Sequence, residues 1–322
     1  MFSWSTDHIA PRERFEHWRE VRAKGVFGVT AELDPDQDGE FKGSMTIRPL
    51  GAAALVELHA TPYRVSRTRA DIARAPSDSL CLYQQLDGGG WFEAARGGEF
   101  VTPRGTLATS HSDLPYSTAP MTAAGFHLRV LKIPNGAALT RRAHELVAMP
   151  LDDRVPVTAL IQSCFSDLAA KADNLDSAQA ESLVQALAQL TLIARGVAEA
   201  RSESSRAALR VGRLSAARYI IGRDADRASL SPAFVAGQLG ISVRHLHALF
   251  EPTGQSFSQS VTAARLAEAC RRLRQHPSQP VADIAFACGF DSLATFHRVF
   301  RAAFYMPPGD YRRSLQGKGP DG

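Results

Sequence analysis

The carboxyl-terminal third of the chain contains an internal repeat. FVAGQLGISVRHLHALF (residues 234–250) matches DIAFACGFDSLATFHRVF (residues 283–300) in the spacing of its apolar, Gly and Ser residues. Gly240 and Gly289 occupy the same place in the two copies, where a turn with positive φ needs a residue without a Cβ atom. The pattern predicts two helix-turn-helix units.

The small and polar residues of each copy support this prediction. Ala236 and Ala285 let two helices cross closely, and Ser242 and Ser292 can cap the second helix of each copy. Either copy alone would also fit an ordinary αα-hairpin. The repeat lies in a basic part of the chain, because residues 210–322 carry 15 Lys and Arg against 8 Asp and Glu. Two copies with this charge favour DNA binding.

A long helix is predicted between the two copies. SFSQSVTAARLAEACRRLRQ (residues 256–275) places Val261, Leu266, Cys270 and Leu273 at helical spacing. Such a helix can act as a rigid strut between the two recognition helices. A separation of ~34 Å would let them enter successive major grooves on one face of the duplex.

The amino-terminal part is predicted to be rich in β-strands. An amphipathic helix over residues 11–24 is followed by short stretches rich in β-branched and aromatic residues, separated by Gly, Pro, Asp and Ser. These stretches are residues 41–50, 53–60, 63–69, 80–86, 90–94 and 125–133. Their number and spacing predict a sandwich or barrel of about 130 residues, from about residue 25 to about residue 150.

Two helices are predicted over residues 156–198, with KADNLDS as their turn. The second helix is apolar around a wider arc than one packing face needs, and it includes Leu187 and Leu190. This surplus fits either a homodimer interface or packing on the β domain. The polar residues 201–208 are interpreted as an interdomain linker.

These elements predict an α+β protein of two domains. With 322 residues the chain is long enough for two cores of ordinary size. The first domain is expected over residues 1–200 and the second, all-α, over residues 209–322. The amino terminus has no signal-peptide pattern, and no run approaches the ~18 apolar residues of a membrane helix. A cytoplasmic protein without a membrane partner is therefore expected.

The carboxyl-terminal part of the sequence resembles the AraC/XylS family of bacterial transcription regulators. The resemblance rests on RLAEACRRL, VADIAFACGFDSLATFHRVFRAAF and PPGDYRR, and it covers residues ~210 to 313. Many members have Phe-Gly where this chain has Phe304 and Tyr305, so a less sharp final turn is expected. The resemblance implies promoter DNA and RNA polymerase as partners, and it leans towards activation.

The amino-terminal part resembles, in layout and in GGGWFEAARGGEFVTPRG, the cupin-type sensor domain and dimerisation helices that many members carry. This implies a small-molecule effector of unknown identity and a homodimer. Effector-binding residues are expected inside the barrel, although strand alternation can turn some of them outward. The candidates are Arg64, Tyr83, Trp91 and His127.

Candidate DNA contacts lie on the exposed faces of the two predicted recognition helices, residues 243–251 and 292–301. They are Arg244, His247, Ala248, Leu293, Ala294, His297, Arg298 and Arg301. An Arg fork matches O6 and N7 of guanine, and small apolar side chains can touch a thymine methyl group. We expect Arg244 and His297 to read bases, and Arg298 and Arg301 to hold phosphates.

No catalytic residue, cofactor or metal is predicted. The histidines at 59, 111 and 127 lack an H-x-H pair with a downstream Glu, and the four cysteines form no C-x-x-C pair and are expected to be buried free thiols. A metal-dependent cupin-type oxygenase fused to a DNA-binding domain is the enzyme alternative. An architectural DNA-binding protein without ligand sensing is the other.

Overall fold

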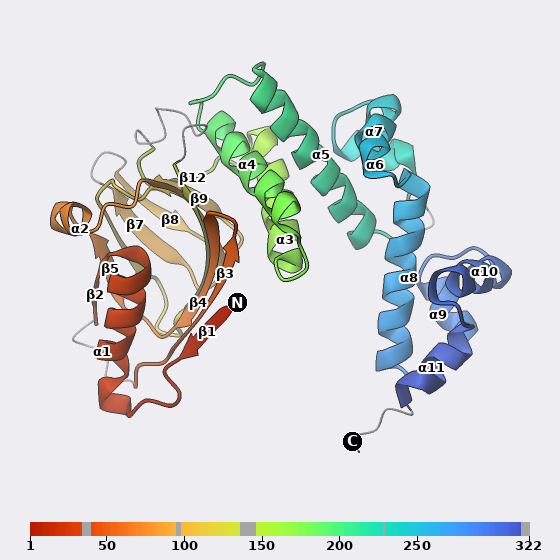
Figure 1. The fold of residues 1–322 in the computed structure, drawn as a ribbon, viewed down its shortest axis with the longest axis horizontal. Helices are drawn as coiled ribbons and strands as arrows, with labels where there is room; N and C mark the ends of the chain where they lie inside the picture. Colours follow the sequence, from red (N-terminus) through yellow and green to blue (C-terminus); the bar gives the residue numbers. More distant parts are fainter. Residues whose placement is uncertain (34–39, 95–97, 136–145, 228, 317–322) are drawn as a thin grey trace. The chain divides into compact units, whose positions relative to one another are not determined.

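The chain folds into two compact units in a computed structural model that describes residues 1–33, 40–94, 98–135, 146–227 and 229–316. The first unit covers Met1–Gly212 and the second covers Arg213–Gly322 (Figure 1). Strands dominate the first unit, and the second is helical. The α+β fold class predicted from the sequence is confirmed.

Two antiparallel sheets build the first unit and curve around a common interior (Figure 1). Within the described ranges, the seven-stranded sheet has the order β1 (Phe2–Ser5), β3 (Gly43–Leu50), β4 (Ala53–Ala60), β11 (Phe126–Pro134), β6 (Ser79–Asp87), β9 (Leu107–His111) and β12 (Met149–Pro150). The five-stranded sheet has the order β2 (Thr30–Glu32), β5 (Arg64–Arg67), β10 (Tyr116–Pro120), β7 (Gly90–Ala94) and β8 (Gly98–Thr102).

The six stretches predicted as strands correspond to β3, β4, β5, β6, β7 and β11. The other strands were not predicted, because they are short or polar, as in LATSH of β9 and YSTAP of β10. All five residues of β9 are nevertheless buried, because Leu107 packs in the cluster with α3 and α4 and Ala108 packs with Tyr83 and Val130 on the other face of the sheet. Pairing partners far away in the sequence hold these strands, so local residue preference gives little sign of them.

The predicted amino-terminal helix is present as a continuous helical segment. It begins with a short 3-10 turn (Pro11–Glu13), continues as α1 (Arg14–Trp18) and ends in a wider π-helical stretch (Arg19–Phe27). The Trp18 ring is buried and packs against Phe41 and directly over Gly43, where a Cβ atom would lie 2.7 Å from the indole. The segment therefore closes one side of the barrel. A shorter helix, α2 (Arg69–Arg74), follows β5.

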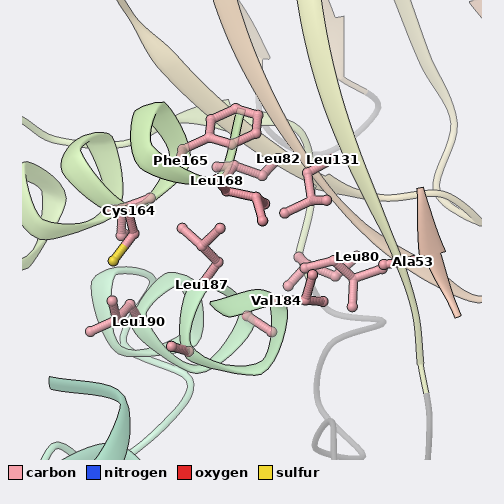
Figure 2. Close-up of a cluster of buried hydrophobic side chains, with 14 of the residues drawn as sticks. Ala53, Leu80, Leu82, Leu131, Cys164, Phe165, Leu168, Val184, Leu187 and Leu190 are labelled. Atoms are coloured by element: carbon pink, nitrogen blue, oxygen red, sulfur yellow. The ribbon is translucent and has the colours of Figure 1, made fainter. Parts of the chain in front are cut away.

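The two predicted helices, α3 (Pro156–Lys171) and α4 (Ser177–Ala194), pack against each other and on one face of the seven-stranded sheet. Figure 2 shows Leu187 and Val184 of α4 between Phe165 of α3 and the sheet residue Leu80. Leu187 and Leu190 are both 0% exposed. The wide apolar arc of α4 is therefore used inside the first unit, and these two leucines are not available to a second copy.

The polar stretch expected to form a linker lies mostly in a helix. Helix α5 covers Glu203–Arg223, and the division between the compact units falls within it, after Gly212. Ser205 and Ala208 are buried, so residues 201–208 are not the solvated connection that their composition suggested. Gln189 donates a hydrogen bond to Ser205 Oγ at 2.9 Å, which holds the start of α5 against α4.

The second unit contains both copies of the repeat. The first copy is α6 (Pro232–Gln238) and α7 (Val243–Phe250), and the second copy is α9 (Val281–Ala287) and α10 (Leu293–Phe304). The strut α8 (Phe257–Gln275) connects them, and α11 (Pro308–Gln316) follows the second copy. Each copy packs in an apolar cluster of its own, one around Leu246 and Phe250 and the other around Phe296 and Phe300. Among the described residues, no helix is long and apolar enough to cross a membrane.

Candidate nucleic-acid interface

The internal turns of the two copies have the geometry that the repeat predicts. Gly240 has a φ of 62° and Gly289 a φ of 82°, in the left-handed region that suits a residue without a Cβ atom. Ser242 Oγ accepts a hydrogen bond from the His245 amide at 3.1 Å, and in the second copy Ser292 Oγ accepts one from the Thr295 amide at 3.2 Å. Both predicted caps are confirmed, and they fix where each recognition helix begins.

Helix α7 turns an apolar face inward and a polar face outward. Leu246, Leu249 and Phe250 are buried, whereas Arg244 and His247 are exposed. Ala248, the third candidate of this copy, is half-buried. The His247 ring also lies edge-on to Phe257 of α8, with 6.5 Å between ring centroids, which limits its reach.

Helix α10 repeats this division over three turns. Phe296 and Phe300 are buried, and four of the five candidates are exposed: Ala294, His297, Arg298 and Arg301. Leu293 is half-buried against the apolar cluster of the second copy, so its side chain presents less surface than the sequence suggested. Thr295 is also exposed on α10. Thr295 was not among the predicted contacts, although its place three residues before Arg298, and so on the same side of the helix, was the available signal.

The exposed arginines of the two recognition helices keep their charge available. Within the described part of the chain, no carboxylate forms a salt bridge with Arg244, Arg298 or Arg301, whereas Arg271 and Arg272 of the strut pair with Glu268 at 2.5 and 2.6 Å. A guanidinium group without a partner can donate to base edges or to phosphate oxygens. This arrangement suits contact with a polyanion such as duplex DNA.

The turn after α10 differs from the expectation. Tyr305 takes the left-handed position that Gly commonly occupies, with a φ of 59°, and its amide donates to the Arg301 carbonyl at 2.9 Å. The turn is therefore as tight as a Gly would make it, although Tyr replaces Gly. Phe304 and Tyr311 pack with 5.4 Å between ring centroids, which holds α11 against α10. The Tyr305 side chain itself is 92% exposed.

The first unit contains an apolar pocket between its two sheets. The pocket is narrow: the centres of water-sized spheres have ≈ 40 Å³ available in it, within a hollow of ≈ 350 Å³ that includes open solvent at its mouth. Its walls come from both sheets and are mostly apolar: Tyr63, Val65, Gln85, Gly89, Gly90, Phe92, Thr118, Ala119, Pro120, Phe126 and Leu128. Gln85 and Thr118 supply polar side chains, and the lining includes no charged residue.

The four effector candidates do not line this pocket. Arg64 is exposed, and Trp91 lies on the opposite face of β7 from the pocket residue Phe92. His127 lies on the outer face of β11, where its Nε2 is 2.8 Å from Glu57 Oε1. The expectation of an interior position is therefore wrong for these three, because strand alternation turns them outward.

Tyr83 is buried on the inner face of the barrel. Its hydroxyl is 2.9 Å from Ser110 Oγ, and its ring lies 6.1 Å from the pocket residue Phe92. Burial, together with Cys81 and Tyr116 nearby, raises the pKa of Tyr83 well above its ordinary value. Tyr83 is thus a neutral hydrogen-bonding group beside the pocket.

The buried polar network of the first unit stabilises its loops. Arg67 is buried and donates to the backbone carbonyls of Ser112 and Ala75 at 3.0 and 2.7 Å and to Asp113 at 3.3 Å. Burial opposes ionisation of Asp113, but the Ser77 and Asp78 amides and Arg67 together lower its pKa. Among the described residues, no group of three or more His, Cys, Asp and Glu side chains could hold a metal ion.

Comparison with protein families assigns both units. Residues 18–195 match the model of an AraC-binding-like domain, and residues 235–314 match that of a helix-turn-helix domain. The first match alone covers more than half of the chain. The chain belongs to the AraC family. As a member of the AraC family, with this helix-turn-helix domain, it is a DNA-binding transcriptional regulator.

Individual relatives agree with the AraC assignment. The chain is 25% identical to the transcriptional activator NphR of a Rhodococcus species over 289 residues, which are 87% of this chain and 83% of that protein. It is 38% identical to the transcriptional regulator Rob of Salmonella typhimurium over 83 residues, 26% of this chain and 28% of Rob. The crystal structure of the AraC-like transcriptional activator CuxR superposes with a TM-score of 0.52 at 19% identity, covering 89% of this chain and 99% of that one. That similarity shows the two-unit fold.

Proposed function

We propose that the protein is an effector-responsive activator that uses both copies of the repeat to bind promoter DNA. The observation that carries the proposal is the exposure of Arg244 on α7 and of Arg298 and Arg301 on α10, which pair with no carboxylate among the described residues. The two helices are capped and are connected by one strut. Arg244 and His297 read base edges, and Arg298 and Arg301 hold phosphates. The net charge of +7 over residues 210–322 supplies the electrostatic attraction.

The smaller candidates complete the interface. Ala248 and Ala294 are small enough to approach a thymine methyl group, and the half-buried Leu293 contributes apolar surface at the start of α10. His247 lies on the outer face of α7 and contributes a polar contact near the backbone. In this proposal the two copies contact adjacent segments of one duplex face.

The effector in this proposal is a small, neutral and mainly apolar molecule. The support is the pocket between the two sheets, whose lining has no charged side chain, with Gln85 and Thr118 as hydrogen-bonding groups. Tyr83 lies beside the pocket and can move with Phe92 when a ligand enters. In this proposal the protein has two conformations that differ in their affinity for DNA. The effector changes promoter occupancy because it binds one of these conformations more tightly than the other.

We expect a homodimer that uses the outward side of α4, where Glu181, Ser182 and Gln185 are exposed, and not the buried Leu187. Activation implies contact with RNA polymerase, and the site of action is the cytoplasm. We do not expect catalysis, because the family assignment concerns regulation of transcription.

Footprinting of purified protein on genomic DNA, with and without candidate small molecules from neighbouring pathways, tests the proposal. We expect a defined set of protected promoter sites and a change in occupancy with one neutral effector. In vitro transcription from a protected promoter should rise with the effector. Protection without sequence preference would contradict the proposal and favour an architectural protein, and turnover of a small organic substrate by iron-loaded protein would favour an oxygenase.

A further inference from the structure

Besides their connection through the strut, the two copies of the repeat come into contact at their turns. The turn after α5 leads into α6 of the first copy, and the turn between α9 and α10 is the internal turn of the second copy. Gly289 lies against the turn after α5, because a Cβ atom on it would lie 2.6 Å from the Ala225 carbonyl oxygen and 3.0 Å from Asp226 Cα. The apolar clusters of the two copies are separate, so this contact is not part of a common core.

The Arg265 side chain of the strut reaches both sides of this contact. Its Nε donates to the Ala225 carbonyl at 2.8 Å, and its Nη2 donates to the Arg227 carbonyl at 3.4 Å. Its guanidinium carbon lies 5.9 Å from the centre of the Phe290 ring, within the range of a cation–π interaction. One side chain thus connects α8, the turn after α5 and the turn of the second copy.

The turn that receives Arg265 is itself held in place. Asp224 is buried, and its carboxylate accepts hydrogen bonds from Arg223 and forms an ion pair with Arg227 at 3.2 Å. Both carbonyls that face Arg265 therefore belong to a well-constrained segment. Only a guanidinium group can donate from two nitrogens on one edge while its flat face lies on an aromatic ring.

We propose that Arg265 is a positioning residue that fixes the distance and rotation between the two recognition helices, and so sets the spacing of operator segments that the protein accepts. The inference rests on the proposed function, in which both copies contact DNA. One inserted base pair moves the second segment by about 3.4 Å and rotates it by about 34°. A rigid pair of recognition helices rejects such a change, whereas a loosened pair adapts to it.

The test uses the full chain and an operator selected from random duplexes by the wild-type protein. Hydroxyl-radical footprints locate the two contacted segments, and variants of this operator then carry one base pair fewer or one or two more between them. We expect wild-type affinity to fall at least about tenfold on each altered spacing, a loss comparable to one or two mismatched base pairs. For Arg265→Ala we expect the loss of affinity on each altered spacing to be about threefold or less. The affinity of this variant for the operator with the original spacing should change by a smaller factor than its discrimination between spacings.

Matched variants separate positioning from a general structural role. Arg265→Lys keeps the charge but cannot donate twice from one edge, so it should not restore the spacing preference. Arg271→Ala removes an arginine of the same helix whose hydrogen bonds go to Glu268 and Gln275 within α8, and it should leave the preference unchanged. Phe290→Leu removes the ring and keeps apolar volume. It should weaken the spacing preference in part. If Arg265→Ala loses its helical circular dichroism, Phe290→Leu replaces it as the test variant.

The possible outcomes distinguish the two claims. If Arg265→Ala binds all spacings more weakly by one common factor, or discriminates among them as the wild type does, the positioning role is wrong and the proposed function stands. If the wild-type footprint covers a single segment and binding tolerates every spacing, the two-copy mode of DNA binding is wrong, and the positioning role falls with it.

Discussion

The first and second copies of the repeat use the same residue types at their internal turns, but in different surroundings. At Gly240 a Cβ atom would meet no other atom within 4 Å, whereas at Gly289 it would collide with the backbone of Ala225 and Asp226. The first glycine is needed for its φ angle alone. The second is needed also because another part of the chain lies against it. An identical motif residue can therefore have one function in one copy and two in the other.

The ends of the recognition helices show the opposite kind of difference. The chain leaves α7 through a short 3-10 turn (Glu251–Thr253) and reaches a left-handed Gly254, with a φ of 68°. It leaves α10 through Tyr305 at nearly the same φ. The backbone conformation is shared and the residue type is not, so the second copy tolerates a strained tyrosine where the first has glycine.

The largest expected effect separates the two internal glycines. Gly289→Ala should lower the free energy of unfolding of the second unit by about 3 kcal/mol, because left-handed strain and backbone overlap add, whereas Gly240→Ala should cost about 1 kcal/mol through strain alone. Native-state hydrogen exchange of amides in α6, α7, α9 and α10 of the full chain measures both. Equal losses in the free energy of unfolding would show that the backbone at Ala225 moves away from the added methyl group. The contact would then not distinguish the two copies.

The next largest effects are expected on DNA affinity, when exposed residues of the two recognition helices are replaced. Arg244→Ala and His297→Ala should each cost about 1 to 3 kcal/mol on the preferred operator and relax selectivity at one or two base pairs. Arg301→Ala should weaken binding to all sequences alike and lower the salt dependence by about one unit. Affinities over a library of single-base operator variants at two salt concentrations measure these effects. A uniform loss for His297→Ala would mean that the second copy positions the protein while the first reads sequence.

How much of this interface the sequence predicts depends on how local the feature is. The glycine turns and the serine caps follow from contacts within a few residues, and the repeat predicted all of them. The tight turn at Tyr305 did not follow, because a local preference argues for Gly there. Packing of α11 through Phe304 and Tyr311 stabilises the turn from outside it.

The first unit was harder to predict for the same reason. Periodicity predicted α4 and its wide apolar arc, but it cannot say whether a sheet of the same chain or a second copy covers Leu187. Alternation along a strand gives two faces without saying which one is inside, so Arg64, Trp91 and His127 were expected in the interior and lie outside it. The pocket itself depends on pairing between strands distant in sequence.

The ends of the recognition helices provide a third, smaller comparison. Tyr305→Gly should raise the stability of the second copy by about 1 kcal/mol by removing the left-handed strain of a side chain that is almost fully exposed. Gly254→Ala should lower that of the first copy by a similar amount. Hydrogen-exchange protection at the last turns of α10 and α7 reports the two changes. A loss of stability in Tyr305→Gly would mean that the tyrosine ring makes a stabilising contact.

The smallest difference is expected at the two caps. Ser242→Ala and Ser292→Ala should each cost about 1 kcal/mol, with a difference of no more than about 0.5 kcal/mol, because the hydrogen bonds they remove have nearly the same length. The amides of His245 and Thr295 should become faster to exchange by similar factors. Ser258→Ala, within α8, serves as the matched control, and it should leave both amides unchanged.

The separation of the two apolar clusters has a consequence for how such a regulator can diversify. The cluster around Leu246 and the cluster around Phe296 belong to different copies, and they are connected through α8. A substitution in the core of one copy therefore reaches the packing of the other through α8 and the contact of Gly289 with Ala225, and not through a shared core. In the proposed two-copy mode of DNA binding, natural selection can therefore change the recognition helix of one copy to fit a new half of a promoter while the other half remains recognised, and target genes can be gained one half-operator at a time.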